Sequence, residues 1–235
     1  LRINSPKFLG SNNCSDIFSK IFDCLFLDPD LKQIYKINCK EVGFDKSSEV
    51  YFLDCLLKMR IFIGGSVSEN IDNKYIEEGN KLVELILEND FEVLCCADLR
   101  GFIGKLYSNM KKRTDKKIIL TVPKIYKKYT TNIKEKIDIV TNTINERTDE
   151  SIKNSDVCLF MPGGIGTIYE IMSTIETKRA GEHKNKIVIV NNFGYYNEFI
   201  NMLEKVYKEE FAETSTKELY KIVNTVEEAI NYIKK

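Results

Sequence analysis

The sequence has few of the residues on which metal and triad chemistry depend. It contains a single histidine, His183, so a site built from several histidines is excluded, and a Ser-His-Asp triad would have to use that one residue. None of its seven cysteines belongs to a CxxC pair, so we expect buried thiols in a reducing compartment rather than metal ligands. The chemistry must therefore come from carboxylates, arginines or backbone N–H groups.

The chain also lacks long uncharged apolar segments and a net charge. A membrane-spanning helix needs about 18 to 20 apolar residues, and no stretch approaches this length. The first residues lack the apolar region of a signal peptide, so we expect a cytoplasmic protein that does not bind membranes. Because 35 acidic residues balance 35 basic ones, the overall charge does not favour nucleic acid as a partner.

One basic segment departs from this balance. Between Lys111 and Lys136 the chain has ten lysines or arginines and two acids, with Tyr126 and Tyr129 among them. Basic residues beside aromatic ones can bind single-stranded nucleic acid. Since no RNA-binding motif accompanies them, we favour a solvated crossover segment and expect no nucleic-acid partner. The segment could also raise the local concentration of an anionic nucleotide.

Apolar and amphipathic runs alternate from residue 59 to residue 235. Strand-like runs such as MRIFIGG and DVCLFM are each followed by apolar residues at helical spacing. Strands that are almost wholly apolar belong to a parallel sheet that is covered on both faces. The pattern predicts an α/β fold, a Rossmann-like three-layer domain over residues 59–235 with a mostly parallel central sheet, in which ligands bind beyond the carboxyl ends of the strands. Residues 1–58 lack the pattern and are predicted to be an N-terminal extension of unknown role.

A glycine-rich turn follows the apolar run DVCLFM. The sequence MPGGIGTIYE places Gly163, Gly164 and Gly166 where a strand passes into a helix that we expect to begin near Thr167. The first N–H groups of a helix have no intrahelical partner and carry positive partial charge, so the turn suits a phosphate. It is neither a Walker A loop nor a GxGxxG fingerprint, which disfavours ATP and NAD sites of those types.

The glutamate beyond this turn, Glu170, has two interpretations. Thr167 and Glu170 have the spacing of a capping box, in which the glutamate only closes the helix N-terminus. Alternatively, Glu170 is catalytic. Arg147 favours the second interpretation, because its helix is expected to begin at the carboxyl end of a strand on the same side of the sheet. The alternative for Arg147 is a solvated surface arginine.

These residues also carry a resemblance to a known family. The segment INERTDESIKNSDVCLFMPGGIGTIYEI, residues 144–171, is similar to the paired MxxRK and PGGxGTxxE signatures of the LOG (Lonely Guy) family, whose members were long labelled lysine decarboxylases. The resemblance covers about residues 60–235 and includes the paired Tyr195 and Tyr196. It implies the Rossmann-like fold of the SLOG superfamily and a homodimer.

The resemblance further implies a phosphoribohydrolase that needs no metal or organic cofactor. Family members split the N-glycosidic bond of cytokinin riboside 5′-monophosphates or AMP and release a free base and ribose 5-phosphate. Arg147 and Glu170 match the catalytic pair, and a carboxylate beside C1′ can stabilise an oxocarbenium-like ribosyl group. The residues implied to hold the 5′-phosphate and line the nucleotide pocket are Gly65, Ser66, Gly163, Gly164, Gly166 and Thr167.

The sequence departs from the family pattern at several positions. Ile144 and Thr148 stand where the family has methionine and lysine, and CCADLR, with Asp98, replaces a glycine-rich turn. A carboxylate at residue 98 would repel a phosphate unless it faces away. The alternative is therefore a SLOG-type module that senses or carries a nucleotide without efficient turnover, like the domains attached to NAD-consuming effectors in bacterial immunity.

Overall fold

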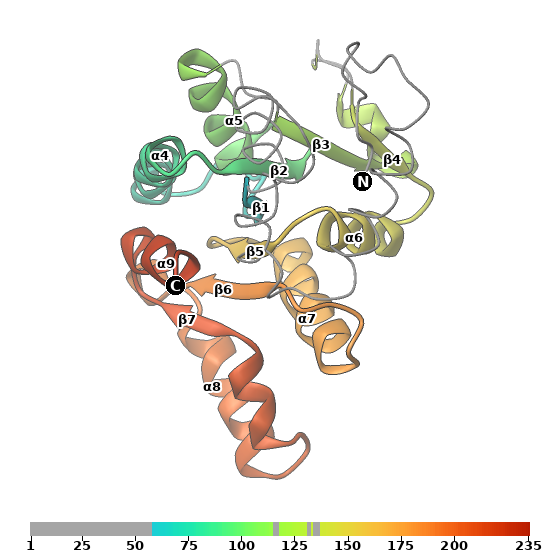
Figure 1. The fold of residues 1–235 in the computed structure, drawn as a ribbon, viewed down its shortest axis with the longest axis vertical. Helices are drawn as coiled ribbons and strands as arrows, with labels where there is room; N and C mark the ends of the chain where they lie inside the picture. The colour runs from blue at the N-terminus through green and yellow to red at the C-terminus, as the bar shows by residue number, and fades with distance from the viewer. Residues whose placement is uncertain (1–57, 115–117, 131–132, 134–136) are drawn as a thin grey trace, which may run out of the picture. The chain divides into compact units, whose positions relative to one another are not determined.

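The sheet of the computed structural model is entirely parallel and has the strand order β4-β3-β2-β1-β5-β6-β7 (Figure 1). The structure describes residues 58–114, 118–130, 133 and 137–235, so residues 1–57 of the predicted extension lie outside it. The parallel sheet confirms the predicted α/β fold. The strands are β1 (Arg60–Gly64), β2 (Glu92–Cys96), β3 (Ile118–Pro123), β4 (Ile139–Thr141), β5 (Val157–Phe160), β6 (Lys186–Val190) and β7 (Lys221–Val223).

Helices between the strands cover both faces of the sheet. Figure 1 shows α4, α5 and α9 on one face and α6 and α7 on the other. None of the helices within the described ranges is long and apolar enough to cross a membrane. The helices are α4 (Asn73–Glu88), α5 (Gly101–Arg113), α6 (Ile144–Lys153), α7 (Ile165–Arg179), α8 (Asn197–Lys208) and α9 (Val226–Ile233).

The sheet separates two hydrophobic cores. Successive strand residues point to opposite faces, so Ile61 and Ile63 of β1 pack in the core beneath α4, α5 and α9, while Phe62 packs in the core on the other face. All three side chains are at most 1% exposed. Because both faces are buried, the strands read as continuous apolar runs instead of alternating ones.

The strand order reverses between β1 and β5. From β1 the chain passes to β2, β3 and β4 on one side, whereas β5 leads to β6 and β7 on the other. Gly64 and Phe160 are register partners at the carboxyl ends of β1 and β5. In open α/β sheets, ligands bind in the crevice beyond such a reversal. The turns after β1 and β5 carry the glycines that the sequence predicts for the site.

Candidate functional site

The glycine turn lies between β5 and α7, and α7 begins at Ile165, earlier than predicted. Gly164 is the N-cap residue of the helix, and no side chain caps it. Thr167 is therefore the third helical residue, and Glu170 lies in the second turn of the helix. The capping-box interpretation of Thr167 and Glu170 is wrong, because a glutamate so far inside the helix cannot close its N-terminus.

The glycines of this turn have different surroundings. A Cβ atom on Gly163 would overlap Thr167 Oγ1, so only glycine allows this close approach. A Cβ atom on Gly164 or Gly166 would meet nothing within 4 Å, and both residues are exposed. The N-terminus of α7 is therefore open to solvent beside these two glycines, where its first N–H groups can bind an anion.

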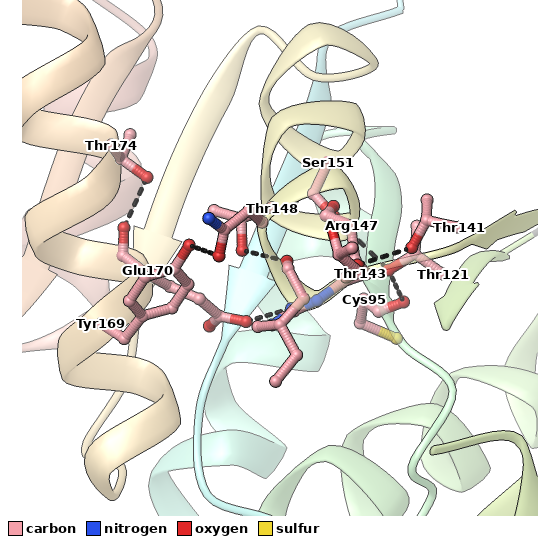
Figure 2. A network of polar contacts seen from close by, with 12 residues as sticks. Cys95, Thr121, Thr141, Thr143, Arg147, Thr148, Ser151, Tyr169, Glu170 and Thr174 are labelled. Carbon is pink, nitrogen blue, oxygen red and sulfur yellow. Dashed lines mark hydrogen bonds and ion pairs between the residues drawn. The ribbon is translucent and has the colours of Figure 1, made fainter. Parts of the chain in front are cut away.

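Arg147 of α6 and Glu170 of α7 point toward each other (Figure 2). Arg147 Nη1 donates a hydrogen bond to Glu170 Oε1, and the two side chains are only 8% and 9% exposed. The second carboxylate oxygen, Oε2, lies at the end of β1, because a Cβ atom on Gly64 would be 2.8 Å from it. The ion pair therefore lies at the reversal between β1 and β5.

The start of α6 positions Arg147. Thr143 Oγ1 accepts a hydrogen bond from the Glu146 N–H at 3.1 Å, and Glu146 Oε2 accepts one from the Asn142 N–H at 2.7 Å. This capping arrangement begins α6 directly after β4. Arg147 then follows in the first turn, on the buried side of the helix, and its carbonyl accepts a hydrogen bond from Ser151 Oγ at 2.8 Å.

The electrostatics of the pair involve a neighbouring thiol. Burial lowers the pKa of the Arg147 guanidinium, but Glu170, Cys96 and Tyr169 outweigh this effect, and the pKa lies above its ordinary value. Burial raises the pKa of the Cys96 thiol to about 11, with Arg147 opposing and Glu170 reinforcing the rise. Buried ion pairs are weak sources of stability. An ion pair with such neighbours at a strand-order reversal, where open α/β sheets bind their ligands, is instead a candidate functional site.

Two departures from the LOG pattern have a clear structural outcome. Thr148 is fully buried, and its hydroxyl donates a hydrogen bond to Ile144 O at 3.2 Å, within its own helix. It therefore provides no substitute for the charge of a lysine. The Asp98 carboxylate accepts two hydrogen bonds of 2.7 Å from the Arg100 guanidinium. This neighbour balances the negative charge that would otherwise repel a phosphate.

Gly65 and Ser66 lie in the turn after β1, beside the glycine turn. The Ser66 N–H donates to Pro162 O at 3.3 Å, which joins the two turns. The Ser66 hydroxyl accepts a hydrogen bond from the Ser68 N–H at 3.1 Å. A Cβ atom on Gly65 would lie 2.8 Å from Phe102 Cδ1, so this glycine allows α5 to pack closely. The nucleotide-binding roles of both residues stay predictions.

Sequence reasoning missed two residues of the site, Gly64 and Cys96. Gly64 adjoins both Glu170 Oε2 and the Phe160 ring, which a Cβ atom would approach to 2.6 Å. The doubled glycine at the end of a strand was the available signal. Cys96 is the last residue of β2 and lies next to the ion pair. In the sequence, the only sign that it belongs to the site was its position at the end of an apolar run.

Other features of the described residues lie apart from the ion pair. A groove of about 340 Å³ runs along β4 and α6 and does not include Arg147 or Glu170. Its lining contains the carboxylates of Glu146, Asp149 and Glu150, which disfavour an anionic ligand. Within the described ranges, no group of three or more His, Cys, Asp or Glu side chains is placed to hold a metal ion.

Part of the basic segment forms a 3₁₀-helix, Lys124–Thr130, after β3. The centroid of the Tyr129 ring lies 5.0 Å from the Arg100 guanidinium carbon and 5.1 Å from Lys128 Nζ. Tyr126 and Tyr129 are 42% and 45% exposed, and the solvated crossover segment stays a prediction. The remaining basic residues include several that lie outside the described ranges.

Comparison with curated proteins identifies relatives of part of the chain. The chain is 29% identical over 87 residues to the cytokinin riboside 5′-monophosphate phosphoribohydrolase LOG3 of Arabidopsis thaliana, and the matched region covers 37% of this chain and 40% of that protein. It is 28% identical over 91 residues to the probable cytokinin riboside 5′-monophosphate phosphoribohydrolase LOG4 of Oryza sativa subsp. japonica, where the matched region covers 39% of this chain and 40% of that protein. The matched region thus spans about two fifths of the length of these relatives.

Solved structures share the fold over a larger part of the chain. The Moco carrier protein from Chlamydomonas reinhardtii matches with a TM-score of 0.54 and 17% identity, covering 75% of this chain and 96% of that one. The molybdenum cofactor binding protein from Rippkaea orientalis matches with a TM-score of 0.51 and 18% identity, and the match again covers 75% of this chain and 96% of that one. At these identities the likeness concerns the fold alone.

A family model matches more than half of the sequence. The model described as "possible lysine decarboxylase" matches residues 105–233, which contain Arg147, the glycine turn and Glu170. The match agrees with the LOG relatives and with the signature that the sequence carries. The chain therefore belongs to the possible lysine decarboxylase family, to which its resemblance to LOG proteins pointed.

Proposed function

We propose that the protein is a nucleoside 5′-monophosphate N-glycosidase, a phosphoribohydrolase that releases a free base and ribose 5-phosphate. The observation that carries this proposal is the direct pairing of Arg147 with Glu170 near the open N-terminus of α7. The curated relatives support it, since their names describe phosphoribohydrolases that act on cytokinin riboside 5′-monophosphates.

The 5′-phosphate binds at the glycine turn in this proposal. The Cβ positions of Gly164 and Gly166 face open space, so neither residue obstructs a phosphate that approaches the N–H groups of the first helical turn. Gly163 and Thr167 pack against each other and keep the turn in shape. The phosphate then fixes the distance between the ribose and the acid of the second helical turn, Glu170.

Hydrolysis exchanges one bond at C1′ for another. The bond between C1′ and the base nitrogen breaks, the base leaves with its electron pair, and positive charge develops on the ribosyl group. Glu170 stabilises that charge and orients a water molecule, whose oxygen forms the new bond to C1′. One proton of the water is lost and the departing base takes up a proton, so the reaction is balanced without a cofactor.

Arg147 has a positioning and a binding role in this mechanism. Its bond to Glu170 Oε1 fixes the plane of the carboxylate, while Oε2 lies at the end of β1 next to Gly64. A guanidinium holds several donors in one plane, so it can orient a carboxylate and bind a substrate oxygen at the same time. Lysine has no such planar geometry.

A second candidate function is nucleotide binding without efficient turnover. The observation that favours it is Thr148, which bonds to its own helix where the LOG pattern has a lysine. The site then has one positive charge fewer to stabilise a transition state. Two structural neighbours are described as carrying or binding the molybdenum cofactor, but they resemble this chain only in fold.

Product analysis with AMP and a cytokinin riboside 5′-monophosphate separates the two functions. We expect the purified chain to release adenine or the cytokinin base together with ribose 5-phosphate, and to leave adenosine, which has no phosphate anchor, largely intact. Binding of the monophosphates without product would support the carrier function. Failure to bind or cleave any monophosphate would overturn both proposals.

The homodimer that the family resemblance implies is also part of the proposal. Sedimentation at several protein concentrations measures the mass of the assembly directly. A mass of about 54 kDa, twice the 27.2 kDa of the chain, is the expected result.

A further inference from the structure

The loop after β6 reaches the glycine turn through two adjacent tyrosines. The Tyr195 hydroxyl donates a hydrogen bond to Gly163 O, and the Tyr196 hydroxyl donates one to Met161 O, each at 2.8 Å. Both acceptors belong to the backbone between β5 and α7. Two side chains that follow one another in the sequence therefore hold two carbonyls of the turn that is proposed to bind phosphate.

The backbone of this loop is shaped to direct both side chains toward the turn. Phe193 and Gly194 have positive φ angles of 56° and 71°, an uncommon conformation for phenylalanine. The φ of Gly194 favours glycine, and a Cβ atom there would also lie 2.7 Å from the side-chain amide nitrogen of Asn197. Asn191 Oδ1 accepts a hydrogen bond from the Tyr196 N–H at 2.7 Å, which fixes the end of the loop.

The two tyrosines differ in their surroundings. Tyr196 is 1% exposed, and burial raises the pKa of its hydroxyl, which remains a protonated donor. Tyr195 is 44% exposed and packs edge-on against the Tyr196 and Tyr75 rings, with centroids 4.9 Å and 5.7 Å away. Tyr195 is thus the member of the pair whose hydroxyl the fold can lose without leaving a cavity in the core.

The chemistry of the turn gives these two bonds a purpose. An anion is attracted by N–H groups and repelled by carbonyl oxygens, so an anion site needs the carbonyls of its loop turned away and held there. Met161 O and Gly163 O are the acceptors that the tyrosines hold, while the adjoining Gly164 and Gly166 face open space. The hydroxyls act through the backbone and do not need to touch the ligand.

We infer that Tyr195 and Tyr196 are positioning residues that hold the carbonyls of the glycine turn away from a bound phosphate and so set the affinity of the site for phosphorylated ligands. This inference rests on the proposed function for the identity of the anion. It assigns the tyrosines neither to stacking on a base nor to contact with the reacting atoms.

Calorimetric titration of Tyr195→Phe and Tyr196→Phe with ribose 5-phosphate and with inorganic phosphate tests the inference. Loss of one hydroxyl bond should weaken binding of ribose 5-phosphate about fivefold, a typical effect of one hydrogen bond. With AMP as substrate, KM should rise by a similar factor while kcat stays within about twofold, because Glu170 and Arg147 are unchanged. Tyr207→Phe is the matched control, since it removes a tyrosine hydroxyl bond to Tyr220 at 3.1 Å, away from the turn.

The outcomes distinguish this inference from the proposed function. Equal phosphate affinity in wild type, Tyr195→Phe and Tyr207→Phe would overturn the inference and leave the proposed function standing. Tyrosine-dependent phosphate binding without any cleavage of AMP would support the inference and overturn the enzymatic proposal. If Tyr196→Phe melts much earlier than wild type, Tyr195→Phe alone decides the matter. A wild-type chain that binds neither phosphate nor ribose 5-phosphate would overturn both.

Discussion

The N-termini of α7 and α9 carry the same local sequence pattern but have different structures. Each has a threonine followed three residues later by a glutamate, Thr167–Glu170 in one and Thr225–Glu228 in the other. In α9 the Thr225 hydroxyl accepts a hydrogen bond from the Glu228 N–H at 3.2 Å, so the pair caps the helix. In α7 the helix begins at Ile165, and the glutamate reaches Arg147 instead.

The residues before the threonine explain this difference. Asn224 precedes Thr225, and its N–H donates to Glu228 Oε2 at 2.8 Å, which completes the cap of α9. In α7 the N-cap residue is Gly164, which has no side chain, so the N-cap makes no side-chain bond. The comparison indicates that a threonine side chain satisfies the Glu228 N–H in the first turn of α9, whereas no side chain of the N-cap residue does this in α7.

The largest expected effect comes from removing the charge of one glutamate and not the other. Glu170→Gln should lower the rate of base release from AMP about 1,000-fold, because the developing positive charge at C1′ loses its carboxylate. Glu228→Gln should keep wild-type activity, since glutamine also serves in a capping box. Both variants are assayed by chromatography of the free base. Equal activity of the two would remove the distinction between the helices.

A second test moves the Glu170 carboxylate without changing it. In Gly64→Ala, the new methyl group would lie 2.8 Å from Glu170 Oε2 and 2.6 Å from the Phe160 ring, so the carboxylate must shift. We expect kcat to fall about 100-fold, as small misplacements of reacting groups cost this much, and stability to fall by about 1–3 kcal/mol. Steady-state kinetics and urea unfolding measure the two effects. Unchanged kcat would show that Gly64 does not position the acid.

A third test closes the open N-terminus of α7. Gly166→Ala places a methyl group in space that is empty within 4 Å, so it should weaken binding of ribose 5-phosphate about tenfold by obstructing the anion. The same change should stabilise the fold by about 0.5 kcal/mol, because alanine restricts the unfolded chain. Titration and thermal unfolding should therefore change in opposite senses. A variant that binds phosphate as tightly as wild type would place the anion elsewhere.

The smallest expected effect concerns the capped helix. Thr225→Ala removes the hydroxyl that accepts from the Glu228 N–H and should lower the free energy of unfolding by about 1 kcal/mol. Thr225→Ser retains the acceptor and serves as the control, with most of the wild-type stability expected. Neither change should alter phosphate affinity, because the glycine turn that is proposed to bind phosphate lies before α7 and not before α9. A loss of phosphate affinity in either variant would contradict the proposal that α7, and not α9, binds the anion.

The sequence allowed much of the fold to be predicted, but only the local part of the candidate site. The apolar runs marked the strands correctly because a sheet that is buried on both faces needs little besides apolar residues. The glycine turn was recognisable for the same local reason. The sequence did not decide whether Glu170 caps its own helix or pairs with Arg147, because the answer depends on where α7 begins.

The contacts that sequence reasoning missed join distant parts of the chain. Gly64 adjoins Glu170, more than 100 residues later, and Tyr195 bonds to Gly163 across 32 positions. No local pattern encodes such a distance, because it follows from the packing of the finished sheet. The doubled glycine and the paired tyrosines were visible in the sequence, but their acceptors and neighbours were not.

The central place of β1 in the sheet has a consequence for folding. This strand pairs with β2 on one side and with β5, about 100 positions later, on the other, so the carboxylate, the guanidinium and the end of β1 come together only after the long crossover has closed. An intermediate that has formed only β1 to β4 lacks the pairing of β1 with β5. Ligand capture therefore reports that this pairing has formed, and a saturating ligand should slow its opening by mass action.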